Sequence, residues 1–232
     1  LYGMTLSGGI YDNGVLFELN PVGDVYTVLK NFESSTDGGF PWGSLLASGS
    51  KLYGMTTNGG NSGDGVLFEF DLAVEEFAVL KHLDGSSDGA HPYGKLLASG
   101  GKLYGMTYNG GTDDKGTLFE FNPAGNAFTV LKHFNTYPNG KNPKGSLLAS
   151  GGKFYGLASE GGVSSDGTLF EFNPAGNVFT ALKHFDSPGD GAHRLRRGPR
   201  APECDRARQL RPPAAARPPR GARGEERDGR AA

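Results

Sequence analysis

The stretch LYGMTYNGGTDDKGTLFEFNPAGNAFTVLKHF, residues 103–134, decides the fold. It recurs 51 residues later as FYGLASEGGVSSDGTLFEFNPAGNVFTALKHF, residues 154–185, and two further copies precede it in the same register. The copies continue until His193. A fixed period near 50 residues indicates one supersecondary unit that is repeated, with each unit burying its faces on its neighbours.

One period reads as four short strands separated by turns. Two glycines follow Ser99, and Pro-Ala-Gly-Asn occupies residues 123–126. Both sequences are typical of tight turns, because Gly and Asn tolerate positive φ and Pro presets its own φ. No segment shows helical periodicity, and Gly is too frequent for helices. The expected strands of this unit are residues 95–98, 102–107, 116–122 and 127–134.

Apolar residues lie on both faces of the expected strands, since Leu118 points away from Phe119 and Phe121. This pattern is expected when each sheet is packed between two others. Four short strands per period then favour a propeller blade over the coil of a β-solenoid, which is usually shorter. We therefore predict an all-β fold, a β-propeller fragment of about four blades with four antiparallel strands each. The first blade is expected to lack its innermost strand.

Charge divides the chain into two unlike pieces. Residues 1–193 contain 11 Lys, no Arg and 20 acidic residues, which gives a formal charge of −9. Residues 194–232 contain 12 Arg, no Lys and 5 acidic residues, which gives +7. This tail is rich in Arg, Pro and Ala and has no aromatic residue, so it cannot bury enough apolar surface to fold. We predict a repeat domain over residues 1–193 and a disordered tail over residues 194–232.

The tail replaces a repeat segment. DGAH at residues 190–193 matches DGAH at residues 88–91, but the PYGKLLA that should follow is missing. Codons for residues 195–201 can be chosen that encode Tyr-Gly-Ala-Val-Leu-Ala when read one base later. We therefore interpret the tail as a frameshift product; the alternative is a genuine basic tail, which would favour nucleic-acid binding. The charge of −9 on the repeats would repel phosphate, so we expect no nucleic-acid partner.

The motif LYGMTxxGG followed by GxLFEF resembles the GloVer tandem repeat of choice-of-anchor surface proteins from environmental bacteria. It covers residues 1–193, with Ala158 in place of the motif's Thr in the fourth copy. Kelch repeats share the period and the Gly-Gly pair, but the Tyr and Trp expected after that pair are missing. The resemblance implies a propeller-like, exported and surface-anchored protein of unassigned activity. An extracellular or cell-surface location is expected on that ground alone, because the sequence shows neither a signal peptide nor a membrane span.

Loop lengths predict where a ligand would bind. The first and third connections of each period are tight, and the second and fourth are long. In an up-and-down sheet of four strands the two long connections emerge at the same end, and loops on a rigid scaffold commonly carry binding groups. We expect the partner to be a carbohydrate or a protein surface. The residues predicted for this ligand face are Trp42, Tyr93, Asp64, Asp114 and Asp166.

These residues also have plain structural interpretations. Trp42 and Tyr93 occupy equivalent positions, where the third copy has Lys144. The two aromatic side chains either stack on a ligand or plug the loop, and of these two interpretations the plug is favoured. Aspartates of the second connection could bind calcium, but Asp before Gly commonly forms turns. We expect no catalytic residue, metal or cofactor, with calcium as the one cation that these side chains would suit. The aspartates concerned are Asp12, Asp64, Asp113, Asp114 and Asp166.

The histidines and the cysteine offer no obvious metal site. His82, His133 and His184 recur once per copy, where the first copy has Asn31, so they are spread over the repeats. Zinc sites need His or Cys ligands at close spacing. Cys204 is the only cysteine and lies in the tail, which excludes a disulfide framework in the repeats.

Near-identical copies favour a non-catalytic extracellular scaffold for binding or structure, because catalysis needs an asymmetric set of groups. The alternative is a propeller-type hydrolase or lyase with a metal in the central channel. The expected innermost strands, GSLLAS and GKLLAS, offer only Ser, Lys and apolar residues, which disfavours the enzyme. No serine elbow, phosphate loop or dinucleotide fingerprint occurs in the sequence.

Overall fold

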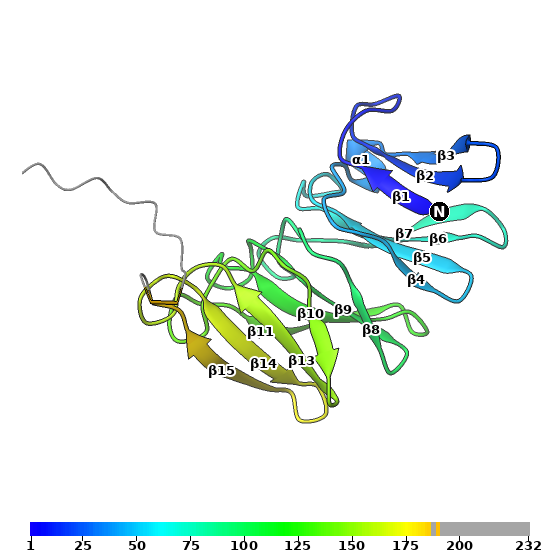
Figure 1. The fold of residues 1–232 in the computed structure, drawn as a ribbon. Helices are drawn as coiled ribbons and strands as arrows, with labels where there is room; N and C mark the ends of the chain where they lie inside the picture. The colour runs from blue at the N-terminus through cyan, green and yellow to red at the C-terminus, as the bar shows by residue number, and fades with distance from the viewer. Residues whose placement is uncertain (187–188, 191–232) are drawn as a thin grey trace, which may run out of the picture. The chain divides into compact units, whose positions relative to one another are not determined.

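The computed structural model describes residues 1–186 and 189–190. Within this part of the chain fifteen strands form four antiparallel sheets, whose colours run from blue to orange along the chain (Figure 1). Each sheet is a meander in which successive strands pair with each other. The prediction of a disordered frameshift tail concerns residues that lie outside the described part.

Three of the four sheets have four strands, and the first has three, as predicted. The first sheet contains β1 (Tyr2–Thr5), β2 (Val15–Asn20) and β3 (Val25–Asn31). The second contains β4 (Leu46–Ser48), β5 (Lys51–Thr56), β6 (Val66–Asp71) and β7 (Glu76–His82). The third contains β8 (Leu97–Ser99), β9 (Lys102–Met106), β10 (Thr117–Asn122) and β11 (Ala127–His133). The fourth contains β12 (Leu148–Ser150), β13 (Lys153–Ala158), β14 (Thr168–Asn173) and β15 (Val178–His184).

The tight turns follow the chemistry that the sequence indicated. Gly100 and Gly101 connect β8 to β9 with φ of 58° and 77°, a left-handed geometry that suits a two-residue hairpin. Between β10 and β11 the Asn122 Oδ1 atom accepts a hydrogen bond from the Ala124 N–H at 3.1 Å. One short helix, α1 (Ser34–Asp37), was not predicted and lies between β3 and β4.

A β-bulge in the last strand of every sheet was also not predicted. Leu118 and Phe119 of β10 pair with Lys132 and Val130 of β11, so Leu131 is an extra residue without a partner. Because the bulge breaks the alternation of side chains, Leu131 and Lys132 both turn toward the fourth sheet. Leu131 packs in the core there, and the Lys132 Nζ atom lies 5.4 Å from the centroid of the Phe179 ring. The equivalent bulged residues are Leu29, Leu80 and Leu182.

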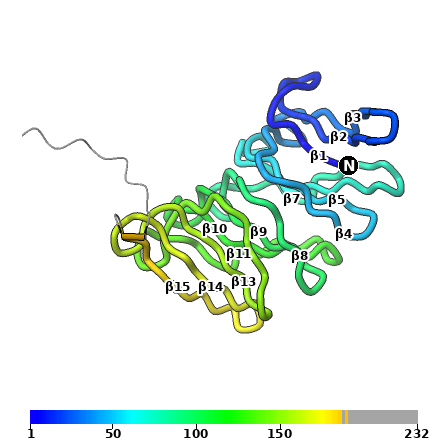
Figure 2. The backbone as a smooth tube through the Cα atoms, viewed as in Figure 1, coloured from blue at the N-terminus to red at the C-terminus, as the bar shows by residue number. Residues whose placement is uncertain are grey.

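The backbone shows the sheets following one another along the chain (Figure 2). Three hydrophobic cores lie between successive sheets, and both faces of the second and third sheets are therefore buried. This arrangement is what the two-faced strand pattern predicted, and it gives the sheets the character of propeller blades. The core between the third and fourth sheets consists of Tyr104, Met106, Leu118 and Phe134 from the third with Leu147, Phe154, Phe170 and Phe172 from the fourth.

One side chain after the last strand of a sheet is inserted into the next sheet, and we call it the inserted residue. Phe134 is 0% exposed, and its ring centroid lies 5.4 Å from that of Phe170 and 5.7 Å from that of Phe179. Phe170 and Phe179 are themselves stacked at 4.8 Å, and we call such a couple the ring pair. The inserted residues are Phe32, Leu83 and Phe134, and we give the same name to Phe185, the equivalent residue after β15. The ring pairs are Phe17 with Tyr26, Phe68 with Phe77, Phe119 with Phe128 and Phe170 with Phe179.

Candidate functional site

The antiparallel order of the strands brings all long connections to one end of the sheets and the tight turns to the other. We call the set of long connections the long-loop face. The second connections on it are residues 6–14, 57–65, 107–116 and 159–167, and the fourth connections are residues 32–45, 83–96 and 134–147.

Each fourth connection is hydrogen-bonded to second connections of the sheets on both sides. The His91 N–H donates to the Asp64 carbonyl at 2.9 Å, and the His91 carbonyl accepts from the Tyr108 N–H at 3.2 Å. The Nδ1 atom of His91 lies 2.9 Å from the carbonyl oxygen of Thr57. Asn142, at the equivalent position, donates from its Nδ2 atom to the Tyr108 carbonyl at 3.0 Å. His91 therefore has a structural role that an amide can also fill, and the loops form a connected network.

The repeated histidines serve the same network from the outer strands. The Nδ1 atom of His133 accepts a hydrogen bond from the Thr112 N–H at 3.2 Å. Asn31 replaces histidine in the first copy, and its Oδ1 atom accepts from the Ile10 N–H at 3.0 Å. His82, His133 and Asn31 thus each fix a second connection by accepting one backbone hydrogen bond, whereas the Nδ1 atom of His184 lies 3.2 Å from the Thr168 hydroxyl oxygen of β14. The histidines stay spread over the sheets as predicted.

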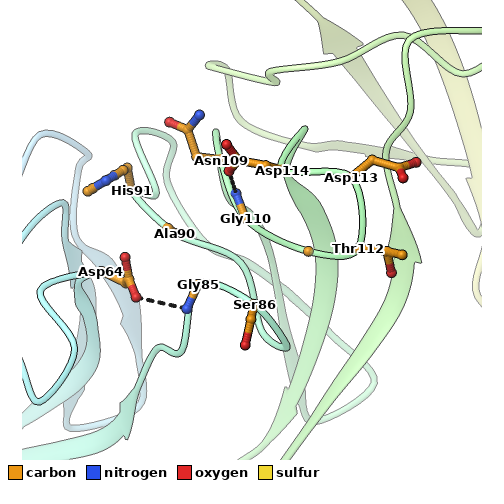
Figure 3. A pocket seen from close by; sticks show the side chains of 11 residues that line it. Asp64, Gly85, Ser86, Ala90, His91, Asn109, Gly110, Thr112, Asp113 and Asp114 are labelled. Atoms are coloured by element: carbon orange, nitrogen blue, oxygen red, sulfur yellow. Dashed lines mark hydrogen bonds between the residues drawn. The ribbon is translucent and has the colours of Figure 1, made fainter.

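An open pocket of about 740 Å³ lies on the long-loop face between the second connections of the second and third sheets (Figure 3). It includes two of the predicted ligand-face residues, Asp64 and Asp114. Backbone groups and small polar side chains form most of the remaining wall. The lining residues are Asp64, Gly85, Ser86, Ala90, His91, Asn109, Gly110, Gly111, Thr112, Asp113 and Asp114.

Two of the three aspartates of this pocket, Asp64 and Asp114, belong to different loops, and each accepts a backbone hydrogen bond (Figure 3). The Asp64 Oδ2 atom accepts a hydrogen bond from the Gly85 N–H at 2.8 Å. The Asp114 Oδ1 atom accepts from the Gly110 N–H at 2.8 Å, and Asp114 has a left-handed φ of 52°. Asp12 forms the same turn, with its Oδ1 atom 2.9 Å from the Gly8 nitrogen. Among residues 1–186, 189 and 190, no three His, Cys, Asp or Glu side chains lie close enough to hold a metal ion.

Asp166, the third predicted aspartate, lies away from this pocket. It lines a separate depression of about 380 Å³ beside the last sheet, together with Leu157, Phe185 and Asp190. The structure therefore brings together two of the three aspartates, because Asp64 and Asp114 belong to neighbouring sheets in the interior of the stack.

Three aromatic side chains form a contiguous row on the long-loop face, which we call the aromatic row. The Trp42 and Tyr93 rings meet edge to face, with centroids 5.8 Å apart and an interplanar angle of 89°. Tyr93 and Tyr108 meet in the same way at 5.4 Å and 86°. The Lys144 Nζ atom lies 5.0 Å from the centroid of the Tyr108 ring at the end of the row. Trp42 is 60% exposed, which is more than a side chain plugging a loop would leave accessible.

Sequence reasoning missed Tyr108 as a member of the row. The equivalent positions hold Leu6, Thr57 and Ser159, so an aromatic residue at this position occurs only in the third copy. That departure from the repeat is the signal that could have identified it. Tyr108 adjoins Asn109 of the pocket and Tyr93 adjoins Pro92 and His91, so the row and the pocket share the same loops.

A set of charged residues repeats on the strands, away from the long loops. The Lys102 Nζ atom lies 2.6 Å from the Glu120 Oε1 atom, and burial raises the pKa of Tyr104 to about 12, helped by its hydrogen bond to Glu120. In the last sheet the hydrogen bond from Lys153 lowers the pKa of Glu171. Each of these glutamates is already neutralised by a lysine, so the set offers no free acid or base for catalysis.

Ion pairs under the fourth connection repeat in three of the four copies. The Lys81 Nζ atom lies 2.8 Å from the Asp88 Oδ2 atom, which also accepts a hydrogen bond from the Asp84 N–H at 3.1 Å. Lys30 pairs with Asp37 at 2.6 Å, and Lys183 with Asp190 at 2.9 Å. In the third copy Asn139 replaces the aspartate, and Lys132 forms no ion pair with any described residue.

Asn139→Asp is therefore expected to stabilise the protein by about 0.2–1 kcal/mol, the usual range for an exposed ion pair. The new carboxylate would accept the Asn135 N–H and pair with Lys132, as Asp88 does with Asp84 and Lys81. Urea denaturation of the variant alone and combined with Lys132→Met measures the pair. A gain that survives removal of Lys132 would contradict this explanation.

Comparison with known proteins places the repeats in a known family. Residues 1–198 match the sequence profile described as the Gloeobacter/Verrucomicrobia repeat, which confirms the predicted resemblance. A search of curated proteins gave no match. No helix among the described residues is long and apolar enough to cross a membrane.

Solved structures confirm the fold class. The extracellular domain of a one-component system from B. thetaiotaomicron is similar with a TM-score of 0.51 and 15% identity, over 75% of this chain and 20% of that chain. The GH74 enzyme of Niastella koreensis is similar with a TM-score of 0.50 and 14% identity, over 72% of this chain and 26% of that chain. The chain covers 56% of the matched chain in the nidogen/laminin complex and 20% of the B. thetaiotaomicron domain, so it spans only part of these proteins' length. At these identities the likeness concerns the fold alone.

Proposed function

Because the chain belongs to the Gloeobacter/Verrucomicrobia repeat family and its units stack as propeller blades, we propose that it is a non-catalytic extracellular scaffold that binds a ligand with its long-loop face. The aromatic row is the observation that carries the proposal. Its rings are partly exposed and arranged in a line beside an open, polar pocket. An extracellular location takes its support from the resemblance to bacterial surface proteins and from the similar extracellular domain of B. thetaiotaomicron.

A carbohydrate is the ligand class that this surface suits best. Tyr and Trp present a large apolar ring with a polar tip, which can pack on a sugar face and hydrogen-bond its hydroxyls. The adjoining pocket offers the side-chain groups of Ser86, Asn109 and Thr112, which are hydrogen-bonding partners for hydroxyls. A protein surface is the second partner class that aromatic anchors favour.

The loop network supports the proposal because it fixes the surface before a ligand arrives. His91 joins two sheets through its N–H, its carbonyl and its Nδ1 atom. Phe40 holds the equivalent place in the network, because its N–H donates to the Asn13 carbonyl at 2.8 Å and its carbonyl accepts from the Thr57 N–H at 3.2 Å. Trp42 and Tyr93 follow Phe40 and His91 by two positions. A surface that is already ordered loses less conformational freedom on binding, which favours affinity.

The hydrolase or lyase alternative receives no support from the innermost strands. β4, β8 and β12 each consist of Leu, Ala and Ser. None of these side chains is a ligand for a channel metal, which would need carboxylates or imidazoles from several blades. The scaffold is therefore the better supported function.

Trp42→Ala is expected to weaken binding of the glycan found by array screening about 10- to 100-fold, the range of an aromatic hot spot. Tyr93→Ala should act in the same direction, because Tyr93 supports Trp42 edge to face. Isothermal titration calorimetry with the array-selected glycan measures both. Val74→Ala is the matched control, since Val74 is 62% exposed in the tight turn between β6 and β7 at the opposite end.

Two outcomes would contradict the proposal. Unchanged affinity of Trp42→Ala would remove the aromatic row from the binding surface, and lost affinity of Val74→Ala would place the ligand at the other end. We expect binding to persist in EDTA, because the Asp64 and Asp114 carboxylates are already bonded to backbone N–H groups. Loss of binding in EDTA with recovery on adding calcium would assign a calcium site to these loops instead.

A further inference from the structure

The first sheet has one face that no described residue covers. Its ring pair is already assembled, with the Phe17 and Tyr26 centroids 5.1 Å apart. Tyr26 is 52% exposed and Val28 is 42% exposed. The residues equivalent to Phe17 in the other three sheets are all 0% exposed, because the preceding sheet packs on them; these are Phe68, Phe119 and Phe170.

The last sheet is open on the opposite face. Leu157 is 49% exposed, whereas Met106 at the equivalent position of the third sheet is 3% exposed. Leu182 is 48% exposed, and the inserted residue Phe185 is half-buried. Inside the stack the next sheet covers these positions, so the two open faces are the two complementary halves of one junction.

We propose that the last sheet of one copy of this chain packs on the first sheet of a second copy, so that the junction between successive sheets is repeated between molecules. Phe185 of one copy then inserts beside Phe17 and Tyr26 of the other. Two junctions inside the chain show this arrangement with an aromatic inserted residue. Phe32 contacts Phe68 and Phe77 at 5.4 and 5.9 Å, and Phe134 contacts Phe170 and Phe179 at 5.4 and 5.7 Å.

A lysine contact repeats across the same junctions. The Nζ atoms of Lys30, Lys81 and Lys132 lie 4.9, 5.4 and 5.4 Å from ring centroids in the following sheet, those of Phe77, Phe128 and Phe179. Lys183 is the fourth lysine of this series, and its side chain is 52% exposed. In the proposed junction it faces Tyr26 of the second copy, an electron-rich ring suited to a cation.

The junction joins unlike faces, so it can either close a ring or build an open chain. The described residues of two copies contribute eight sheets, which falls within the four to eight blades that closed propellers usually contain. We therefore expect a closed dimer with two equal junctions. Burial of both apolar faces also removes the exposed patches that would otherwise favour aggregation.

Sedimentation equilibrium of the full chain is expected to give a concentration-dependent species of twice 24.4 kDa. Tyr26→Glu and Leu157→Glu each place a charge on one of the two faces, and each should weaken self-association at least tenfold. Val74→Glu, an exposed position in the β6–β7 turn, is the matched control and should leave association unchanged. Circular dichroism verifies that each variant is folded, which is expected because all three side chains are partly exposed.

Mixing the two variants separates this junction from other modes of association. Tyr26→Glu keeps an intact last face and Leu157→Glu keeps an intact first face, so an equimolar mixture should form a one-to-one complex although each variant alone is monomeric. A like-with-like contact would not be rescued in this way. A wild-type chain that stays monomeric at all concentrations would overturn the proposal. In that case the two faces would be covered by residues of the same chain or would stay uncovered. Association that is insensitive to both variants would overturn the proposal as well.

Discussion

Phe134→Ala is expected to lower the free energy of unfolding by about 3–5 kcal/mol, the range for deletion of a fully buried phenylalanine. Phe134 is 0% exposed and contacts both rings of the pair formed by Phe170 and Phe179. Alanine would leave a cavity between the third and fourth sheets that the surrounding strands cannot close, because their hydrogen-bonded ladders fix the spacing. Urea denaturation followed by circular dichroism measures the loss.

Phe185→Ala is the matched control, because Phe185 is the inserted residue of the last sheet and is half-buried. Its replacement at low protein concentration should cost about 1 kcal/mol, since little buried apolar surface is removed. Equal losses in the free energy of unfolding for Phe134→Ala and Phe185→Ala would show that packing on the ring pair of the next sheet does not stabilise the protein. In that case the junction between sheets would not depend on the inserted residue.

The variant Phe134→Ala also tests how the sheets cooperate in unfolding. In repeat proteins each unit contacts only its neighbours, so stability depends on the interfaces between units. Phe134→Ala removes the centre of one interface and leaves the core between the first and second sheets unchanged. Hydrogen exchange is therefore expected to rise most in β12–β15 and least in β1–β3, while exchange that rises equally in all sheets would indicate a single cooperative unit.

The fold could be predicted because the period, the turns and the two-faced strands are all local or repeated features. In the third and fourth periods a two-residue Gly-Gly turn and an Asn-Pro-Ala-Gly-Asn turn separate the strands, and apolar residues on both faces require sheets on both sides. The bulge at Leu131 could not be predicted in this way. It alters which residues pair across β10 and β11 without altering composition, so alternation counted along β11 assigns Lys132 to the wrong face.

The candidate site was predictable only in part. Trp42 and Tyr93 were found because they occupy equivalent positions, and the long loops correctly located the end of the sheets where they lie. Tyr108 was missed because it comes from a different connection, and its contact with Tyr93 arises only when the loops fold onto each other. The equivalence of His91 and Asn142 was also hidden, since sequence patterns do not show that an imidazole and an amide hold the same carbonyl position.

A second large effect is expected from Gly105→Ala, which should cost about 3 kcal/mol, the upper part of the usual range for overpacking. A Cβ atom on Gly105 would lie 2.4 Å from the Phe119 Cζ atom and 3.1 Å from the Leu96 Cδ2 atom. Phe119 is 0% exposed and is stacked on Phe128 with centroids 4.8 Å apart, so its ring has no space into which to move. The glycine is thus required by the close approach of the ring and not by a left-handed φ.

Gly3→Ala provides the matched control for this argument. A Cβ atom on Gly3 would lie 2.7 Å from the Phe17 Cζ atom, a similar clash in the equivalent place of the first sheet. Phe17 faces the uncovered side of that sheet and is only half-buried, so the ring can rotate away. Alanine also restricts the unfolded chain more than glycine does, and this entropic effect stabilises the folded protein by about 0.4–1 kcal/mol. The net loss in the free energy of unfolding for Gly3→Ala should therefore be about 0–1 kcal/mol. Equal destabilisation by the two substitutions in urea melts at low protein concentration would show that the glycine matters for the strand itself. A marked difference would locate the constraint in the packing of one sheet on the next, which is the same contact that the inserted residues make.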